Sequence, residues 1–205
     1  WIYKQYDSQV QANTVFKPGE SDAAVIRLRE QNEKNKNKVF SGVAASVDCN
    51  SRWVFLDPFR GTIAAVAESA RNVSCVGAEP VAITNNLNFP SPETDIGYWQ
   101  LSSSCNGISE ACKAFETPVT GGNVSLYNES KNKENEITPI NPTPVIGMVG
   151  KIDNVEKAIS SEWKNIHDQI WLIGSYKSET TISASSYLEY FHGEITGRPP
   201  KLDLG

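Results

Sequence analysis

Apolar residues recur along the chain at two different spacings, which separate expected strands from expected helices. Apolar and β-branched runs predict strands at residues 23–28, 39–48, 52–56, 81–87 and 119–127, with a closing strand at residues 142–152. Apolar positions three and four apart predict helices over residues 62–73 and 95–115. This order of elements is typical of an α+β or α/β fold.

The second expected helix carries its apolar side chains along one face. They are Leu101, Cys105, Ile108, Cys112 and Phe115. This stripe accounts for both cysteines as core residues, which is a simpler interpretation than redox chemistry. We therefore expect this face of the helix to be buried.

A polar stretch at residues 153–168 is the clearest domain boundary in the chain. It follows an expected domain at residues 21–152, which is preceded by an N-terminal segment at residues 1–20. Residues 169–205 come after it. The absence of Met at position 1 leads us to expect a piece of a longer protein.

The part beyond the boundary contains a predicted buried strand at residues 169–173 and a predicted helix at residues 183–191. Because one strand and one helix cannot close a core, we expect this part to be the truncated start of a second domain. Two polar runs, residues 29–38 and 129–136, predict surface loops.

Composition narrows the class of protein. Of the 205 residues, 39% are hydrophobic and 21% charged, which is typical of a globular protein. The 19 Lys and Arg residues are outnumbered by 24 Asp and Glu residues, which argues against a nucleic-acid-binding surface. No apolar run approaches the roughly 20 residues that cross a bilayer. Four cysteines without a C-x-x-C pair, beside only two histidines, indicate free thiols rather than a zinc site. We therefore expect a cytoplasmic protein that binds neither nucleic acid nor membrane.

The run TGGNVS at residues 120–125 is the most informative candidate for chemistry. Gly121 and Gly122 would let backbone amides approach an anion closely. Asn123 offers a neutral oxygen that suits magnesium, and Ser125, on the same side of an extended chain, could donate a hydrogen bond to a ligand. A Gly-Gly-Asn run is also typical of a tight turn, so the residues alone leave both interpretations open.

Two other segments also have two interpretations. In DPFRG at residues 57–61, Arg60 and the free amides of a helix start could bind phosphate, or Asp57 could pair with Arg60 or cap the helix. In TNNLNFP at residues 84–90, three asparagines could bind adenine or a cation, or form ordinary turns. With no P-loop, G-x-G-x-x-G, paired-histidine or Ser-His-Asp motif, the residues alone indicate an α/β domain with a candidate anion site.

Taken together and in order, eight segments resemble phosphoribosylformylglycinamidine synthase, and the resemblance spans nearly the whole chain. The segments are YKQYD (3–7), LDPFRG (56–61), AESARN (67–72), GAEP (77–80), TNNLNF (84–89), PVTGGNVSLYNE (118–129), PTPVIGMVG (142–150) and HGEITGRPP (192–200).

The resemblance implies a fold and an activity. The family is similar to aminoimidazole ribonucleotide synthetase and has two pseudo-symmetric halves, each an α+β domain followed by an α/β domain. This chain would be the first domain of the second half, a mixed sheet with helices on one face, plus the beginning of the next domain. The family uses ATP to convert formylglycinamide ribonucleotide and ammonia from glutamine into formylglycinamidine ribonucleotide, through an iminophosphate that ammonia displaces.

The resemblance also implies four site residues. Asn85 and Gly122 would contact ATP, Asn123 would ligate Mg²⁺, and Ser125 would contact the ribonucleotide substrate. Many members carry aspartate at the position of Asn85, so this chain keeps a hydrogen-bonding group there but brings no charge. The catalytic histidine of the family lies in the first half, so no catalytic residue is expected here. His167 and His192 are expected to be surface or structural residues.

The implied partners are formylglycinamide ribonucleotide, the missing first half of the synthase and a glutamine amidotransferase subunit. A homodimer through the exposed sheet is a further expectation. Two alternatives remain beside the synthase. One is a non-catalytic module that pairs through its sheet and binds nucleotide passively. The other is an ATP-dependent relative of the selenophosphate or thiamine-phosphate kinase type, against which the order of the segments argues.

Overall fold

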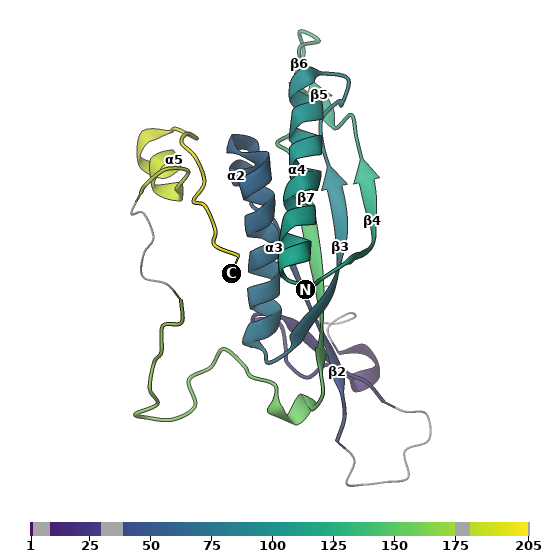
Figure 1. Cartoon of the computed structure of the whole chain (residues 1–205), viewed down its shortest axis with the longest axis vertical. Helices are drawn as coiled ribbons and strands as arrows, with labels where there is room; N and C mark the ends of the chain where they lie inside the picture. Colours follow the sequence, from purple (N-terminus) through teal and green to yellow (C-terminus); the bar gives the residue numbers. More distant parts are fainter. Residues whose placement is uncertain (2–8, 30–38, 175–180, 205) are drawn as a thin grey trace.

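The computed structural model describes residues 1, 9–29, 39–174 and 181–204. The YKQYD segment and all but the first residue of the polar run at 29–38 lie outside the described residues. Figure 1 shows a two-layer arrangement, with two long helices lying side by side over one face of a twisted sheet. This arrangement is an α+β fold with a mixed sheet, as the sequence predicts.

Five strands form the main sheet, in the order β1-β2-β7-β3-β4. They are β1 (Ala24–Arg27), β2 (Gly42–Asp48), β7 (Thr143–Ile152), β3 (Glu79–Asn88) and β4 (Val119–Ser125). All neighbours are antiparallel except β3 and β4, which are parallel. The predicted closing strand is confirmed, but β7 lies at the centre of the sheet, between β2 and β3. This position leaves β4 at one edge.

Two capped helices cover the sheet. Helix α3 (Pro58–Cys75) begins at Asp57, whose side chain accepts a hydrogen bond from the backbone N–H of Arg60 at 3.0 Å. Helix α4 (Asp95–Ala114) begins in the same way at Thr94, which accepts from Gly97 at 3.1 Å. The core between helices and sheet is apolar, and its largest fully buried side chains include Phe89, Ile83, Ile146, Met148, Val66 and Val73.

The predicted buried stripe of α4 is partly wrong. Ile108 and Cys112 are buried, but Cys105 is exposed. The buried face is instead rich in small and polar residues, namely Gly97, Gln100, Ser104, Gly107, Ile108, Ala111 and Cys112. Small residues are needed there because α4 lies close to α3: a Cβ at Gly107 would approach the carbonyl oxygen of Phe59 to 2.5 Å.

The strand predicted at residues 52–56 is wrong, because Ser51–Leu56 form helix α2. The side chain of Asn50 caps this helix by accepting from the backbone N–H of Trp53 at 3.2 Å. A short apolar run is compatible with either a strand or a buried helical turn. Here the cap by Asn50 favours the helix. The loop predicted at residues 129–136 is exposed as expected, but it includes part of a hairpin of two short strands, β5 (Glu129–Lys131) and β6 (Ile137–Pro139).

The buried strand predicted at residues 169–173 is also wrong. These residues form no strand, and their side chains are exposed, with Ile173 at 94%. An apolar run becomes a strand only where partner strands pair with it. The helix predicted nearby is confirmed as α5 (Ser186–His192), and two 3₁₀ turns lie at Val10–Ala12 and Val155–Lys157. Within the described ranges, no helix is both long and apolar enough to span a bilayer.

Candidate functional site

The four predicted site residues lie on the two parallel strands of the sheet. Asn85 belongs to β3, and Gly122, Asn123 and Ser125 belong to the edge strand β4. The pairing register places Asn85 opposite Gly122, Asn86 opposite Asn123 and Asn88 opposite Ser125. Two segments 37 residues apart in sequence are therefore brought together by one strand pair.

Side chains alternate between the faces of a strand, which divides these residues into two groups. On the face opposite the helices, here called the open face, Asn123 Nδ2 donates a hydrogen bond to Asn86 Oδ1 at 3.1 Å. Asn85 is turned to the helix-covered face, since it pairs with the fully buried Ile146 and borders a 530 Å³ pocket beside Ile108. The side chains of the metal ligand Asn123 and the ATP contact Asn85, both implied by the resemblance, thus lie at adjacent residue pairs and on opposite faces of the sheet.

A pocket of 430 Å³ lies on the open face at this register. It is lined by Val47, Thr84, Asn85, Asn86, Gly122, Asn123, Val145 and Gly147. None of these lining residues is charged, and the polar groups among them are hydroxyl, amide and backbone groups. Such a surface can hydrogen-bond a ligand, but any charge that offsets a phosphate must come from elsewhere.

The two glycines are part of the strand and not of a turn. Both lie within β4, and neither has a positive φ, so the tight-turn interpretation is wrong. Gly122 is required by packing, because a Cβ there would come within 2.6 Å of the backbone oxygen of Asn85. A Cβ at Gly121 would meet nothing within 4 Å in the described part of the chain. The close approach of Gly122 leaves its backbone as the group that can contact a ligand.

Ser125 lies on the same side of β4 as Asn123, as the spacing predicts. Its Oγ donates to Asn128 Oδ1 at 3.2 Å, and Asn128 Nδ2 donates in turn to the backbone oxygens of Ser125 at 2.8 Å and Phe89 at 3.1 Å. Asn128 therefore fixes the end of β4 against the end of β3. Sequence reasoning offered Asn86 only as one of the three asparagines at residues 84–90, and it missed Asn128, although both lie in segments that carry the resemblance.

The donor set at Asn123 fits one ligand position of a magnesium ion. Its Nδ2 is used in the bond to Asn86, while its Oδ1 accepts no hydrogen bond from the described residues. A neutral amide oxygen suits a hard cation. Within residues 9–29, 39–174 and 181–204, no group of three or more His, Cys, Asp and Glu residues could hold a metal ion. The described part of the chain therefore supplies an amide oxygen and no carboxylate cluster.

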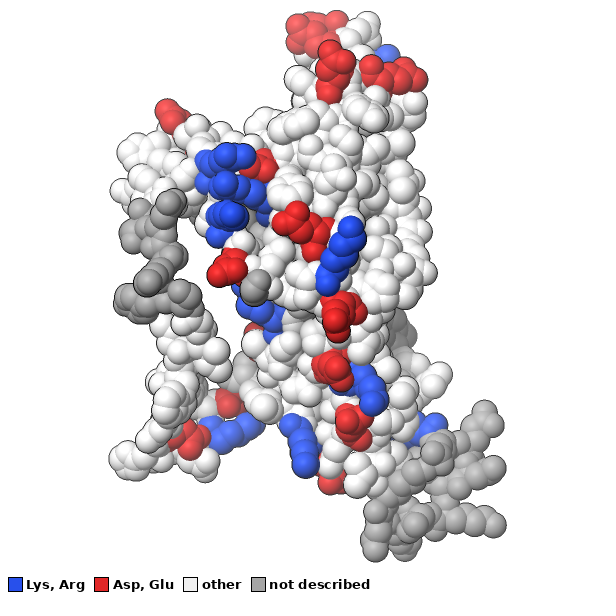
Figure 2. All heavy atoms as spheres, in the orientation of Figure 1, with Lys and Arg blue, Asp and Glu red and all other residues white. Residues whose placement is uncertain are grey.

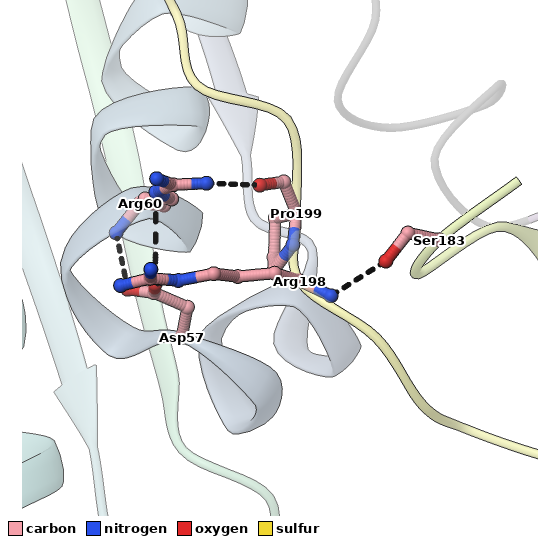
Figure 3. Close-up of polar contacts among 5 residues, drawn as sticks. All are labelled: Asp57, Arg60, Ser183, Arg198 and Pro199. Atoms are coloured by element: carbon pink, nitrogen blue, oxygen red, sulfur yellow. Dashed lines mark hydrogen bonds and ion pairs between the residues drawn. The ribbon is translucent and has the colours of Figure 1, made fainter. Parts of the chain in front are cut away.

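Asp57 and Arg60 have structural roles here, which is one of the two interpretations of the DPFRG segment given above. Asp57 caps α3, and Arg60 NH1 donates to the carbonyl oxygen of Pro199 at 3.0 Å (Figure 3). Neither residue lines the pocket on the open face. Figure 2 shows that acidic and basic side chains are interspersed over the helix-covered face, without a large field of one sign.

The two histidines lie away from the β3–β4 pair. His167 is exposed in the segment after β7, and His192 ends α5, with its ring centroid 5.8 Å from that of Tyr187. Neither borders the pockets at Asn85 and Asn123. Although Cys105 is exposed overall, partial burial of its thiol beside the helix-side pocket raises its pKa, as burial raises the pKa of the Cys112 thiol, so both cysteines stay neutral near pH 7.

Comparisons with known proteins agree with this arrangement. The family described as AIR synthase related protein, N-terminal domain, matches residues 20–152. The phosphoribosylformylglycinamidine synthase subunit PurL of Prochlorococcus marinus (strain MIT 9312) is 94% identical over 204 residues, and the alignment covers 100% of this chain and 26% of that protein.

Solved structures from Thermotoga maritima are similar in fold. PurLQS has a TM-score of 0.62 and 35% identity, over 78% of this chain and 24% of that one. PurL complexed with ATP has a TM-score of 0.61 and 36% identity, over 77% and 23%. PurL complexed with FGAR has a TM-score of 0.58 and 35% identity, over 77% and 23%.

The chain spans about a quarter of the length of its curated PurL relatives, at 26%. The family match over residues 20–152 contains the whole mixed sheet and the two helices that cover it. This chain belongs to the AIR synthase related protein family, whose N-terminal domain it contains.

Proposed function

We propose that this chain forms part of the site at which a phosphoribosylformylglycinamidine synthase converts formylglycinamide ribonucleotide, ATP and ammonia from glutamine into formylglycinamidine ribonucleotide, ADP and phosphate. The 94% identity to a PurL subunit supports the reaction, and the T. maritima PurL complexes with ATP and with FGAR support the ligands. Since the chain covers 26% of that relative, the rest of the site lies in the remaining protein.

One observation carries the proposal for individual residues, namely the register of β3 and β4. The strand pair sets Asn85 beside Gly122 and Asn86 beside Asn123. Asn85 and Gly122 both line the open-face pocket beside Asn123, and they contact ATP there through their backbones, because the Asn85 side chain is turned to the helices and Gly122 has no side chain. The unshared Oδ1 of Asn123 is the magnesium ligand. Magnesium, when bound, offsets phosphate charge at a surface that has no charged side chain of its own.

Ser125 is the proposed contact to the ribonucleotide substrate. It lies two residues beyond Asn123 on the open face, so one strand can serve the metal and the substrate side by side. Asn128 orients its hydroxyl from 3.2 Å away. The hydroxyl can keep this bond as donor and accept a hydrogen bond from a ribose or formyl amide group, because a serine oxygen has two lone pairs.

The proposed partners follow from the incompleteness of the site. They are the rest of the synthase, which carries the catalytic histidine, and a glutamine amidotransferase subunit that supplies ammonia. A second copy of the chain could take the place of the missing half at the open face. The domain division, with residues 21–152 as one unit and residues 169–205 as the start of another, is part of the same proposal.

A sheet-pairing module is the second candidate function. The exposed apolar side chains on the open face favour it, since Val47 is 71% exposed and Ile26 is 50% exposed. Water rarely meets such side chains on the broad face of a sheet, so another surface is expected to cover them. In this candidate the nucleotide contacts are passive, and pairing is the whole contribution of the chain.

The test is ADP release that depends on formylglycinamide ribonucleotide and ammonia. The chain is assayed alone and then mixed with the remaining part of the parent protein, expressed separately. Activity in the mixture only, lost in Asn123→Ala and retained in Asn106→Ala, supports the shared site. Asn106 is the matched control because it is an exposed asparagine on α4. A mixture that forms a complex but releases no ADP above background leaves the pairing module as the better account.

A further inference from the structure

The C-terminal segment, residues 181–204, returns to the domain and lies against α2 and the start of α3 (Figure 1). Helix α2 holds its first part: Trp53 Nε1 donates to the carbonyl oxygen of Ala184 at 2.9 Å. Arg52 NH2 donates to Ser186 Oγ at 3.0 Å, and its guanidinium also pairs with Glu189 of α5. The segment thus has a defined docking surface more than 130 residues away in sequence.

One buried carboxylate joins the later part of the segment to α3. Asp57 is 8% exposed, and its two oxygens have separate tasks. Oδ1 accepts from the backbone N–H of Arg60 at 3.0 Å and caps the helix. Oδ2 accepts from Arg198 Nε at 2.8 Å, with Arg60 Nε at 3.7 Å (Figure 3). Arg60 then reaches the chain beyond Arg198 by donating to the oxygen of Pro199.

The segment is also tied to itself where Arg198 leaves it. The backbone N–H of Arg198 donates to Ser183 Oγ at 2.6 Å, and that of Ala184 donates to the oxygen of Thr196 at 2.9 Å. Gly197 has a φ of +88°, a conformation that favours glycine, and this turns Arg198 back toward Asp57. The bond between Arg198 and Asp57 therefore holds both ends of residues 183–198 in place, because Arg198 is itself bonded to Ser183.

We propose that Asp57 is a positioning residue that anchors the C-terminal segment to the start of α3. It thereby holds residues 183–199 against the N-terminal end of α3. A carboxylate with little access to water needs its charge partners, and Arg198 is the partner that the segment supplies. The side chain of Arg198 is 71% exposed, so the anchor depends on the burial of Asp57 more than on the arginine. The inference does not depend on the proposed synthase activity.

The test is hydrogen–deuterium exchange of the 205-residue chain, followed in peptides from residues 183–198 and from residues 58–65. Asp57→Asn removes the charge but leaves a side chain that caps helices well, so α3 is expected to stay intact. We expect exchange at residues 183–198 to rise about 1.4- to fivefold, the range for losing an ion pair of a partly exposed group. Exchange at residues 58–65 is expected to stay unchanged, because the backbone bond from Gly61 to the oxygen of Asp57 remains.

Three further variants make the outcome decisive. Arg198→Gln breaks the same contact from the exposed side and carries the test if Asp57→Asn fails to fold; the double variant is expected to equal either single one. Glu189→Gln is the matched control, since it removes an exposed ion pair of the same segment and is expected to raise exchange less. Unchanged exchange at residues 183–198 in Asp57→Asn, or an equal rise at residues 58–65, would overturn the proposal.

Discussion

Asn123 and Asn86 join their side-chain amides across two parallel strands, with Asn123 Nδ2 donating to Asn86 Oδ1 at 3.1 Å. The bond fixes the rotation of the Asn123 amide and leaves its Oδ1 without a hydrogen bond from the described residues. Groups that orient a metal ligand commonly contribute nearly as much to metal affinity as the ligand itself. Asn86 is therefore as informative a position as Asn123 for the proposed site.

Replacing Asn86 by Ala is expected to weaken magnesium use in the reconstituted synthase. The variant frees the Asn123 amide to rotate, and losing such an orienting partner typically costs about 10- to 100-fold in metal affinity. The measurement is the Mg²⁺ concentration for half-maximal ADP release. Asn106→Ala serves again as the exposed control. An unchanged Mg²⁺ requirement would show that the Asn86–Asn123 bond does not support a metal.

Gly122→Ala and Gly121→Ala are a matched pair on one strand. A Cβ at Gly122 would approach the backbone oxygen of Asn85 to 2.6 Å, so the strands must separate, whereas a Cβ at Gly121 meets nothing within 4 Å. We expect Gly122→Ala to lower the free energy of unfolding by about 1–3 kcal/mol. Gly121→Ala is expected to stay within about 0.5 kcal/mol. Urea denaturation measures both, and equal effects would contradict the packing account.

Asn50→Ala is expected to destabilise the chain through α2. The side chain of Asn50 accepts a hydrogen bond from Trp53 N–H at 3.2 Å, and loss of such a cap costs about 1 kcal/mol. The free energy of unfolding in urea is the measurement, with Asn50→Asp, which keeps the accepting oxygen, as the control. If the alanine and aspartate variants are equally stable, the cap contributes nothing measurable.

Cys49 is expected to resist alkylation while the exposed Cys75 reacts. Burial first, and then the negative charges of Asp48 and Glu68, raise the pKa of Cys49 from 9.0 to about 11. Only the thiolate reacts, so Cys49 has about one hundredth of the reactive form of an ordinary thiol at pH 8. Iodoacetamide labelling read by peptide mass spectrometry checks this order. Labelling of Cys49 at pH 8 as fast as that of Cys75 would contradict it.

The same shift has a consequence for stability. Because the folded-state pKa of Cys49 lies above its unfolded value, its contribution to the free energy of unfolding is complete below pH 9. The contribution is lost as the pH rises toward 11. Cys49→Ser is expected to make the free energy of unfolding less dependent on pH between pH 9 and pH 11. An unaltered slope in that range would contradict a contribution from the raised pKa of Cys49.

Local periodicity predicted most elements because it records which side of an element meets the core. The approximate positions of β1, β2, β3 and β7 followed from apolar and β-branched runs, and those of α3 and α4 from the spacing of apolar residues. Two errors show its limit. Residues 52–56 are too few for a strand and a helical turn to differ in pattern. Cys105 was placed in the core because the spacing of apolar residues, rather than the close approach of α3, was used to choose the buried face of α4.

The sequence by itself determined the family, the neutral amide and hydroxyl groups of the site and the spacing that puts Asn123 and Ser125 on one side of a strand. Only the tertiary structure decided that Asn123 meets Asn86, that Gly122 is pressed against Asn85 and that Asp57 holds Arg198 from 141 residues away. Spacing along the chain fixes which residues share a face of one element. Which elements become neighbours depends on how β7 enters the centre of the sheet and on how the helices close over it, and no local pattern records these long-range pairings.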